Sequence, residues 1–134
     1  MKKKHRAKWL DRCAVQLPYC YRLCVTEKEF HKEMKRLGVL KDQYPQFLST
    51  THADATCHFF DRADGGKCAI VCMHKDGAKE REKDECYGLL IHEAVHIWQA
   101  CREVIGEKEP STEFEAYSVQ RIAQNLIWSW IEQT

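Results

Sequence analysis

The stretch Tyr87-Gly88-Leu89-Leu90-Ile91-His92-Glu93-Ala94-Val95-His96-Ile97-Trp98 decides how this chain is interpreted, because it sets an H-E-x-x-H sequence inside an apolar, helix-patterned run. On a helix, residues four apart lie one above the other, so the imidazoles of His92 and His96 can share one metal ion. Glu93 is one step round the helix, where its carboxylate can hold a metal-bound water rather than the metal. The pattern predicts a zinc site. The alternative is a helix whose histidines make ordinary hydrogen bonds.

A third ligand is expected after the motif. Eighteen residues separate His96 from Glu115, and Gly106 and Pro110 in this gap would end the first helix and turn the chain. A second helix from near Ser111 would then bring Glu115 beside the histidines. Two histidines and one glutamate leave a fourth tetrahedral position for water, which is typical of catalytic zinc. We therefore expect one Zn²⁺ per chain.

Glu115 has other possible roles. Thr112 and Glu115 form a T-x-x-E pattern, in which Thr112 would be the N-cap and Glu115 would reach back to its amide. Glu113 could be the ligand instead, with Glu115 in solvent. A ligand from an Asp, Cys or His elsewhere also remains open, because zinc ligand sets vary.

The motif, the eighteen-residue spacing and the step Glu115-Ala116-Tyr117-Ser118 resemble the gluzincin metallopeptidases. Residues 51–124 also resemble small zincin-like proteins encoded by phages and prophages, in which a hairpin leads into the metal-binding helix. The resemblance implies a zincin-like fold, with Glu115 as third ligand. It also implies a protein or peptide substrate, held as an added strand along an edge strand of the hairpin 56–73.

The expected chemistry is hydrolysis of a peptide bond by metal-activated water, with Glu93 as general base. A further group would stabilise the transition state, and we take Tyr117 as the catalytic candidate from a set that also contains His52, His58, His74 and Tyr87. Gln99 and Gln120 are candidates to orient a ligand. Two other functions compete: a catalytically silent zincin-fold interaction or phage assembly factor, and a helical domain in which the motif occurs by chance.

Length and composition predict one domain over residues 1–134, with hydrophobic content of 44% and charged content of 31%. A net charge of +1 gives no reason to expect nucleic acid as a partner. No apolar run is long enough to span a membrane. The basic stretch 1–8 is expected to be a solvated tail, and the charges that follow it argue against an export signal. The expected compartment is the cytoplasm, that of the host if a phage carries the gene.

Eight cysteines are expected to be free thiols, because a reducing compartment disfavours disulfides. Cys20 and Cys24 are four residues apart and could share a helix face. Cys68 and Cys72 have the same spacing and would point to one side of a strand. Burial as small hydrophobic residues is the general expectation, and a structural metal site using Cys13, Cys20 and Cys24 is the alternative.

The predicted fold class is α+β: N-terminal helices, one small antiparallel sheet with a hairpin, then two helices that carry the metal ligands. A helix over 26–37 is capped by Thr26 and ended by Gly38, and a less well bounded helix over about 7–13 precedes it. Strands are predicted over 55–60 and 67–73, around a glycine-containing turn. The metal-binding helix is predicted over about 84–103. The last helix is predicted from Ser111, and its core-facing residues are Phe114, Tyr117, Ile122, Leu126 and Trp130.

Overall fold

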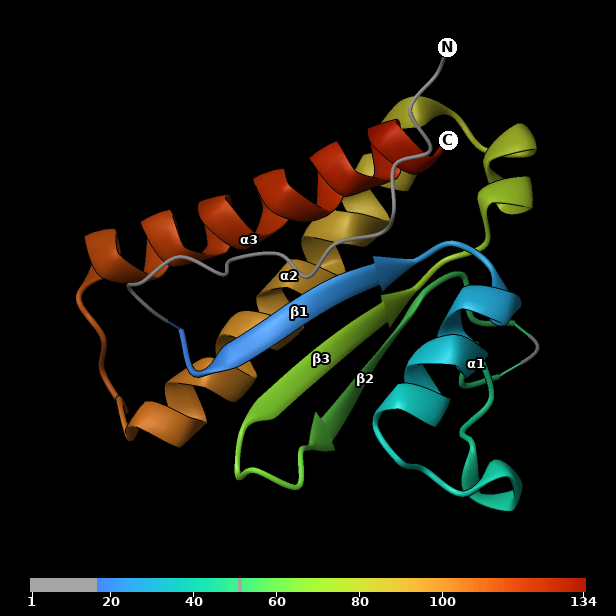
Figure 1. The fold of residues 1–134 in the computed structure, drawn as a ribbon. Coiled ribbons are helices and arrows are strands. Elements are labelled where there is room, and N and C mark those ends of the chain that lie inside the picture. The colour runs from blue at the N-terminus through green and yellow to red at the C-terminus, as the bar shows by residue number, and fades with distance from the viewer. Residues whose placement is uncertain (1–16, 51) are drawn as a thin grey trace, which may run out of the picture.

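A three-stranded sheet lies between one short helix and a pair of long helices in the computed structural model, which describes residues 17–50 and 52–134 (Figure 1). The expected helix over 7–13 and the basic stretch 1–8 lie outside the described residues. The α+β class is confirmed by this arrangement of helices and strands.

The sheet has the strand order β1-β3-β2, with β1 (Tyr19–Cys24), β2 (Thr56–Asp61) and β3 (Lys67–Cys72). The antiparallel hairpin of β2 and β3 confirms the two predicted strands, and Gly65 in its turn has φ of 85°. The expectation of an antiparallel sheet is wrong, because β1 pairs with β3 in parallel. The strand β1 itself was not predicted, and Cys20 and Cys24 share a strand rather than a helix. Arg22 obscures its apolar pattern, and the structure accommodates this charge with Glu33 of the adjacent helix.

Helix α1 (Glu27–Arg36) confirms the predicted helix over 26–37. The Thr26 hydroxyl accepts a hydrogen bond from the Glu29 amide at 3.2 Å, and Gly38 follows the helix with φ of 77°. Such N-capping and left-handed termination satisfy backbone groups that the helix itself leaves open. The helix packs Phe30 and Met34 against one face of the sheet.

Helices α2 (Lys83–Ile105) and α3 (Thr112–Gln133) cover the other face of the sheet. Glu82 caps α2, which begins at Lys83, close to the predicted start at about residue 84. The Ser111 hydroxyl accepts from the Phe114 amide at 3.2 Å and makes Ser111 the N-cap of α3. The capping box of Thr112 with Glu115 is therefore wrong, because Thr112 is already helical. Short 3-10 helices, η1 (Lys41–Gln43) and η2 (Lys75–Lys79), lie in the connections.

The main core lies between the sheet and the α2–α3 pair, and it includes Ile122, Leu126 and Trp130 as predicted. The same prediction is wrong for Phe114 and Tyr117, which are 46% and 64% exposed. At about 100° per residue, Tyr117 projects from the side of α3 opposite to Leu126, and therefore into solvent.

No disulfide joins the seven cysteines among the described residues, and five of them are buried. Cys13 of the alternative structural metal site lies outside the described residues. No helix in the described part of the chain combines the length and the apolar character that a membrane crossing requires.

Candidate metal centre

The two histidines of the motif face each other on the exposed side of α2. Their Nε2 atoms are 3.1 Å apart, and the ring planes are inclined at 76°. Two imidazole nitrogens bound to one tetrahedral zinc at about 2.0–2.1 Å would lie about 3.3 Å apart. The same separation suits a hydrogen bond in which one ring donates and the other accepts. Helical spacing therefore places both nitrogens where a single ion can bind them.

Gln99 orients the ring of His96. Its Oε1 atom lies 3.1 Å from Nδ1 of His96 and accepts a hydrogen bond from the N–H at that position. In a neutral imidazole, a proton on Nδ1 leaves the lone pair on Nε2, which is the atom that faces His92. A side chain that fixes the tautomer of a ligand in this way is a common accompaniment of metal sites. The sequence-based expectation for Gln99 agrees with this contact, whereas Gln120 is exposed on α3.

Glu93 is the buried member of the motif, with 6% of its surface exposed. Burial raises the pKa of its carboxyl above the usual range, and the nearby charges of His92 and His96 oppose this rise. The charge of Glu93 in turn adds to the burial that raises the pKa of the Cys57 thiol on β2. Glu93 thus lies between the histidine pair and the strand β2.

A groove of about 590 Å³ opens at this point, and both His92 and Glu93 line it. The opposite wall is formed by Asp54 and Ala55, which directly precede β2. Because β3 is the central strand, β2 is an edge strand, and its outer edge pairs with no strand among residues 17–50 and 52–134. The groove therefore joins the motif to an edge that an extended peptide can pair with.

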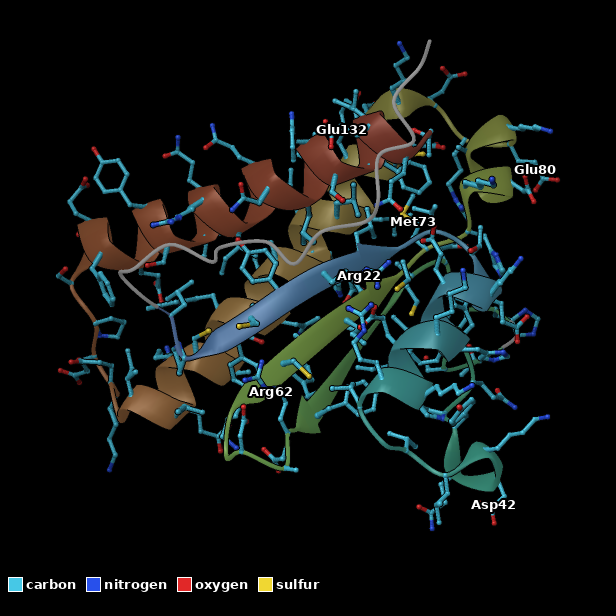
Figure 2. All side chains as sticks on the ribbon, viewed as in Figure 1. Arg22, Asp42, Arg62, Met73, Glu80 and Glu132 are labelled. Carbon is cyan, nitrogen blue, oxygen red and sulfur yellow. The ribbon has the colours of Figure 1, made fainter. Side chains whose placement is uncertain are left out.

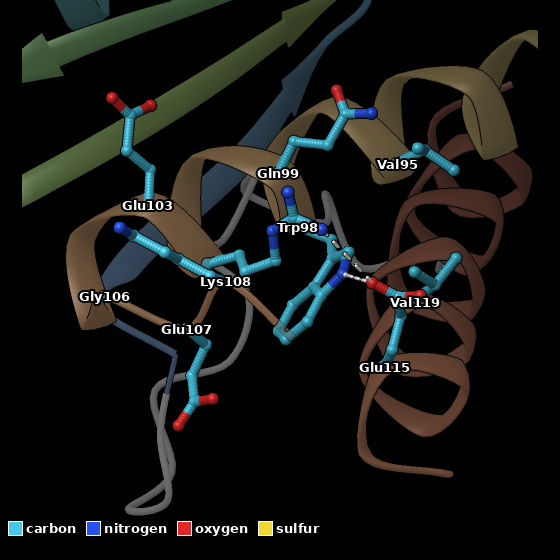
Figure 3. Close-up of a pocket in the computed structure, with 10 residues that line it drawn as sticks. Val95, Trp98, Gln99, Glu103, Gly106, Glu107, Lys108, Glu115 and Val119 are labelled. Carbon is cyan, nitrogen blue, oxygen red and sulfur yellow. Dashed lines mark hydrogen bonds and ion pairs between the residues drawn. The ribbon is translucent and has the colours of Figure 1, made fainter. Parts of the chain in front are cut away.

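Glu115 is on α3 and contacts a different side of α2 from the histidines. Its Oε2 atom accepts a hydrogen bond from the indole Nε1 of Trp98 at 2.8 Å and is 3.9 Å from the Arg102 guanidinium (Figure 3). At about 100° per residue, Trp98 and His96 project from sides of α2 that are about 160° apart. The eighteen-residue spacing thus brings Glu115 to α2, but to the Trp98 side rather than to the histidines.

Trp98, Arg102 and Glu115 border a second cavity, of about 800 Å³, between the end of α2 and the start of α3. Gln99 also lines this cavity while its amide oxygen contacts His96. Gln99 therefore stands between the histidine pair and the cavity that Glu115 borders.

The donor set fits a zinc ion in part. The two imidazoles suit zinc in chemistry and spacing, and Glu93 is beside them as a non-ligand acid. Within residues 17–50 and 52–134, however, no three His, Cys, Asp or Glu side chains gather closely enough to hold a metal ion. The structure brings His92, Glu93 and His96 together and leaves Glu115, the expected third ligand, apart from them.

Glu113, the other acidic candidate, and Tyr117, the candidate catalytic residue, both project into solvent from α3. Glu113 is exposed. Tyr117, as described above, is 64% exposed on the outer side of α3 and does not line the groove beside His92. Of Glu113, Glu115 and Tyr117, Glu115 contacts α2, through the indole of Trp98.

The remaining candidate donors also lie apart from the motif. His58 is on the α1 side of the sheet, where its Nε2 is 3.0 Å from the Phe47 carbonyl oxygen and its ring stacks on Phe30. His74 packs its ring against Phe47 at 4.3 Å, and Tyr87 lines a different cavity near the C-terminus. His52 is exposed and does not line the groove.

Sequence reasoning missed the ion pair at the groove. Arg81, just before α2, pairs with Asp54, just before β2, and both line the groove together with His92 and Glu93. From its charged sequence, the stretch 75–84 is expected to be an exposed connector. The sequence alone therefore indicates neither the position of Arg81 at the groove nor its pairing with Asp54. The charge on Arg81 was the available signal, but its partner is 27 positions away.

Comparisons with protein families, with curated proteins and with solved structures find no match for this chain.

Proposed function

We propose that this chain is a zinc-dependent hydrolase of peptide bonds, in which His92 and His96 bind the metal and Glu93 is the general base. The observation that carries the proposal is the pairing of the two Nε2 atoms at 3.1 Å beside a buried carboxylate. Ionisable groups with perturbed pKa values in a groove are more common at functional sites than elsewhere. The resemblance of the motif to the gluzincin metallopeptidases supports the same reaction.

Bound zinc would polarise the scissile carbonyl and lower the pKa of a coordinated water. Glu93 would accept the proton of the attacking water and transfer it to the leaving amine. Burial raises the pKa of Glu93, and a base works best when its pKa approaches the working pH. Gln99 would hold the ring of His96 in the metal-binding tautomer.

The substrate of the proposed reaction is a protein or peptide in extended conformation. The unpaired edge of β2 offers backbone donors and acceptors next to the groove that His92 and Glu93 line. This choice of β2 rather than β3 follows from the central position of β3. We propose the cytoplasm as the compartment, that of the host cell if the gene belongs to a phage or prophage.

Glu115 is proposed as the third ligand because it is the acid of α3 that faces α2. To bind the metal, its carboxylate would exchange the hydrogen bond from Trp98 and the nearby Arg102 charge for the ion. The hydrogen bond between Glu115 and Trp98 also favours a second candidate function. A chain whose third acid stays with Trp98 would keep the fold without catalysis, as a silent zincin-like interaction or assembly factor.

Zinc content and peptidase activity together test the proposal. Full-length protein purified without chelator should carry about one zinc per chain, and His92→Ala and His96→Ala should each lose it. Glu93→Gln should keep the zinc and lose cleavage of a fluorogenic peptide library. Glu103→Gln is the matched control, because Glu103 is an exposed acid on the same helix, and it should keep both properties.

Three outcomes of this test are decisive. Full zinc occupancy in both histidine variants would refute the metal site. Zinc that depends on both histidines, without cleavage of any peptide by the wild-type protein, would favour the silent interaction factor. Zinc lost in Glu115→Ala and kept in Glu113→Ala would identify the third ligand.

A further inference from the structure

Four cysteines of the sheet form two facing pairs. In the parallel register of β1 and β3, Cys20 lies opposite Cys68 and Cys24 lies opposite Cys72. Side chains on a strand alternate between its faces, so residues four apart point to the same side. Cys24 and Cys72 belong to the core under α1, and Cys20 and Cys68 therefore point to that side as well. Because the cysteines have the same spacing in both strands, they form two cross-strand pairs on the face of the sheet that α1 covers.

The two pairs differ in access to solvent. Cys24 and Cys72 are both 0% exposed, in contact with the cluster around Phe30. Cys20 is half-buried near the start of the edge strand β1, while Cys68 is 1% exposed. A reagent in solution can therefore meet a thiol of the first pair, whereas the second pair is shielded.

A positive charge accompanies the first pair. Burial raises the pKa of Cys68 to about 11, and the Arg62 guanidinium acts in the opposite direction by favouring the thiolate. Arg62 is at the turn between β2 and β3, at the end of the sheet where β1 begins (Figure 2). A cation near a thiol pair assists the attack of a thiolate on a disulfide.

The backbone geometry suits a cross-link. Neighbouring strands are about 4.8 Å apart, which is within the range of about 4.4–6.8 Å between the Cα atoms of disulfide-bonded cysteines. Because β1 is an edge strand with one strand neighbour, a small shift can bring the sulfur atoms together without disturbing β3.

We propose that Cys20 and Cys68 are an oxidation-sensitive pair, which a low-molecular-weight disulfide such as oxidised glutathione converts into a disulfide between β1 and β3, while Cys24 and Cys72 stay reduced. This modification site does not rest on the proposed peptidase function, because neither cysteine lines the groove at His92.

The reaction proceeds by two thiol–disulfide exchanges. The Cys20 thiolate attacks one sulfur of oxidised glutathione, forming a mixed disulfide and releasing one glutathione thiolate. The Cys68 thiolate then attacks Sγ of Cys20 and releases the second glutathione. The protons of the two protein thiols pass to the two glutathione molecules. Two protein thiols are thereby oxidised, and one molecule of oxidised glutathione is reduced.

The experiment treats the full-length reduced protein with oxidised glutathione and maps the thiols. We expect two protein thiols to be lost, with one non-reduced proteolytic fragment that joins Cys20 to Cys68 by mass spectrometry. The cross-link closes a loop through residues 21–67, so the melting temperature should rise by roughly 10 °C. Dithiothreitol should reverse the mass change and the shift in melting temperature.

Two serine variants provide the control. Cys20→Ser should form no cross-link, whereas Cys24→Ser, in the same strand and on the same face, should form the same Cys20–Cys68 fragment. Mapping of the wild-type protein tests the proposal even if a variant fails to fold. A fragment joining Cys24 to Cys72, a cross-link to Cys13, a stable glutathione adduct on Cys20, or unchanged thiols would each overturn it.

Discussion

On one face of the sheet, Glu33 of α1 is 1% exposed and forms an ion pair with Arg22 of β1. On the other face, Glu93 of α2 is 6% exposed and lies beside two imidazoles. No ion-pair partner of Glu93 is found in the part of the chain that the structure describes. The first carboxylate is paired with a guanidinium, whereas the second has its pKa raised by burial and opens onto a groove.

The contrast distinguishes a carboxylate with a structural role, Glu33, from one suited to proton transfer, Glu93. A buried ion pair fixes two elements to each other, and breaking it leaves an uncompensated charge in the interior. A buried acid whose proton affinity is raised, at the wall of a groove, is suited to take up and release a proton.

The largest expected effect is on the α1 face. Arg22→Met removes the partner of Glu33, and the free energy of unfolding should fall by about 3–5 kcal/mol in urea denaturation. Arg36→Met is the control, because Arg36 is 3.6 Å from Glu33 but its side chain is 69% exposed. It should cost less than about 1 kcal/mol. A loss below about 1 kcal/mol for Arg22→Met would contradict the structural role of the pair.

Glu115 gives an intermediate case, because its carboxylate is partly exposed and bound to an indole. Glu115→Ala leaves the Nε1–H of Trp98, a residue 2% exposed, without its acceptor. Thermal or urea unfolding of the metal-free protein should show a loss of about 1–3 kcal/mol. Glu113→Ala, two positions earlier, should cost about 0.3–1 kcal/mol through the helix dipole alone. Equal losses for both variants would argue against the Trp98 contact.

Exchange of each buried glutamate for glutamine sharpens the comparison directly. Glu93→Gln should change the free energy of unfolding of the metal-free protein by less than about 1 kcal/mol, because burial already disfavours the charged form. Glu33→Gln should cost about 1.5–3 kcal/mol, since it weakens a charge-assisted hydrogen bond to Arg22. The urea midpoints of the two variants check this order. A larger loss of stability in Glu93→Gln than in Glu33→Gln would refute the distinction between the two carboxylates.

The smallest effect concerns His58, a titratable group on the α1 face. Burial lowers its pKa below the usual 6.5, although the hydrogen bond to Phe47 acts in the opposite direction. The unfolded chain therefore binds the proton more readily than the folded one. Its stabilising contribution is present above pH 6.5 and is lost as the pH falls from there through the lowered pKa.

His58→Gln should weaken this dependence on pH, by at most about 1 kcal/mol between pH 7 and pH 5. Unfolding midpoints at both pH values check the difference from the wild-type protein. A steeper dependence in His58→Gln would contradict the lowered pKa.

Features set by neighbours in sequence were predictable. The capping of α1 by Thr26 and the facing nitrogens of His92 and His96 depend only on helical spacing, and both are present. The hairpin of β2 and β3 follows from alternation and a glycine turn. The same local logic explains why Gln99, three residues after His96, reaches its ring.

Features set by packing between distant elements were not predictable. The strand β1 contains Arg22, and an arginine in the sequence predicts an exposed position. Its burial depends on the ion pair with Glu33 of α1, which the sequence does not reveal. The position of Glu115 depends on which side of α2 receives α3, and a spacing of eighteen residues does not determine it. Arg81 meets Asp54 only because β2 lies against α2. Partners that are far apart in sequence determine each of these contacts.

The parallel pairing of β1 with β3 has a consequence for how the chain reaches this fold. Asp61 and Lys67 pair across a tight turn, so the hairpin can form on the microsecond scale. Tyr19 and Lys67 pair across almost fifty positions, and that contact must first overcome the entropy of closing a long loop. High contact order slows folding. We therefore expect the addition of β1 to limit the folding rate, and substitutions in the β1–β3 interface to change refolding times more than those within the hairpin.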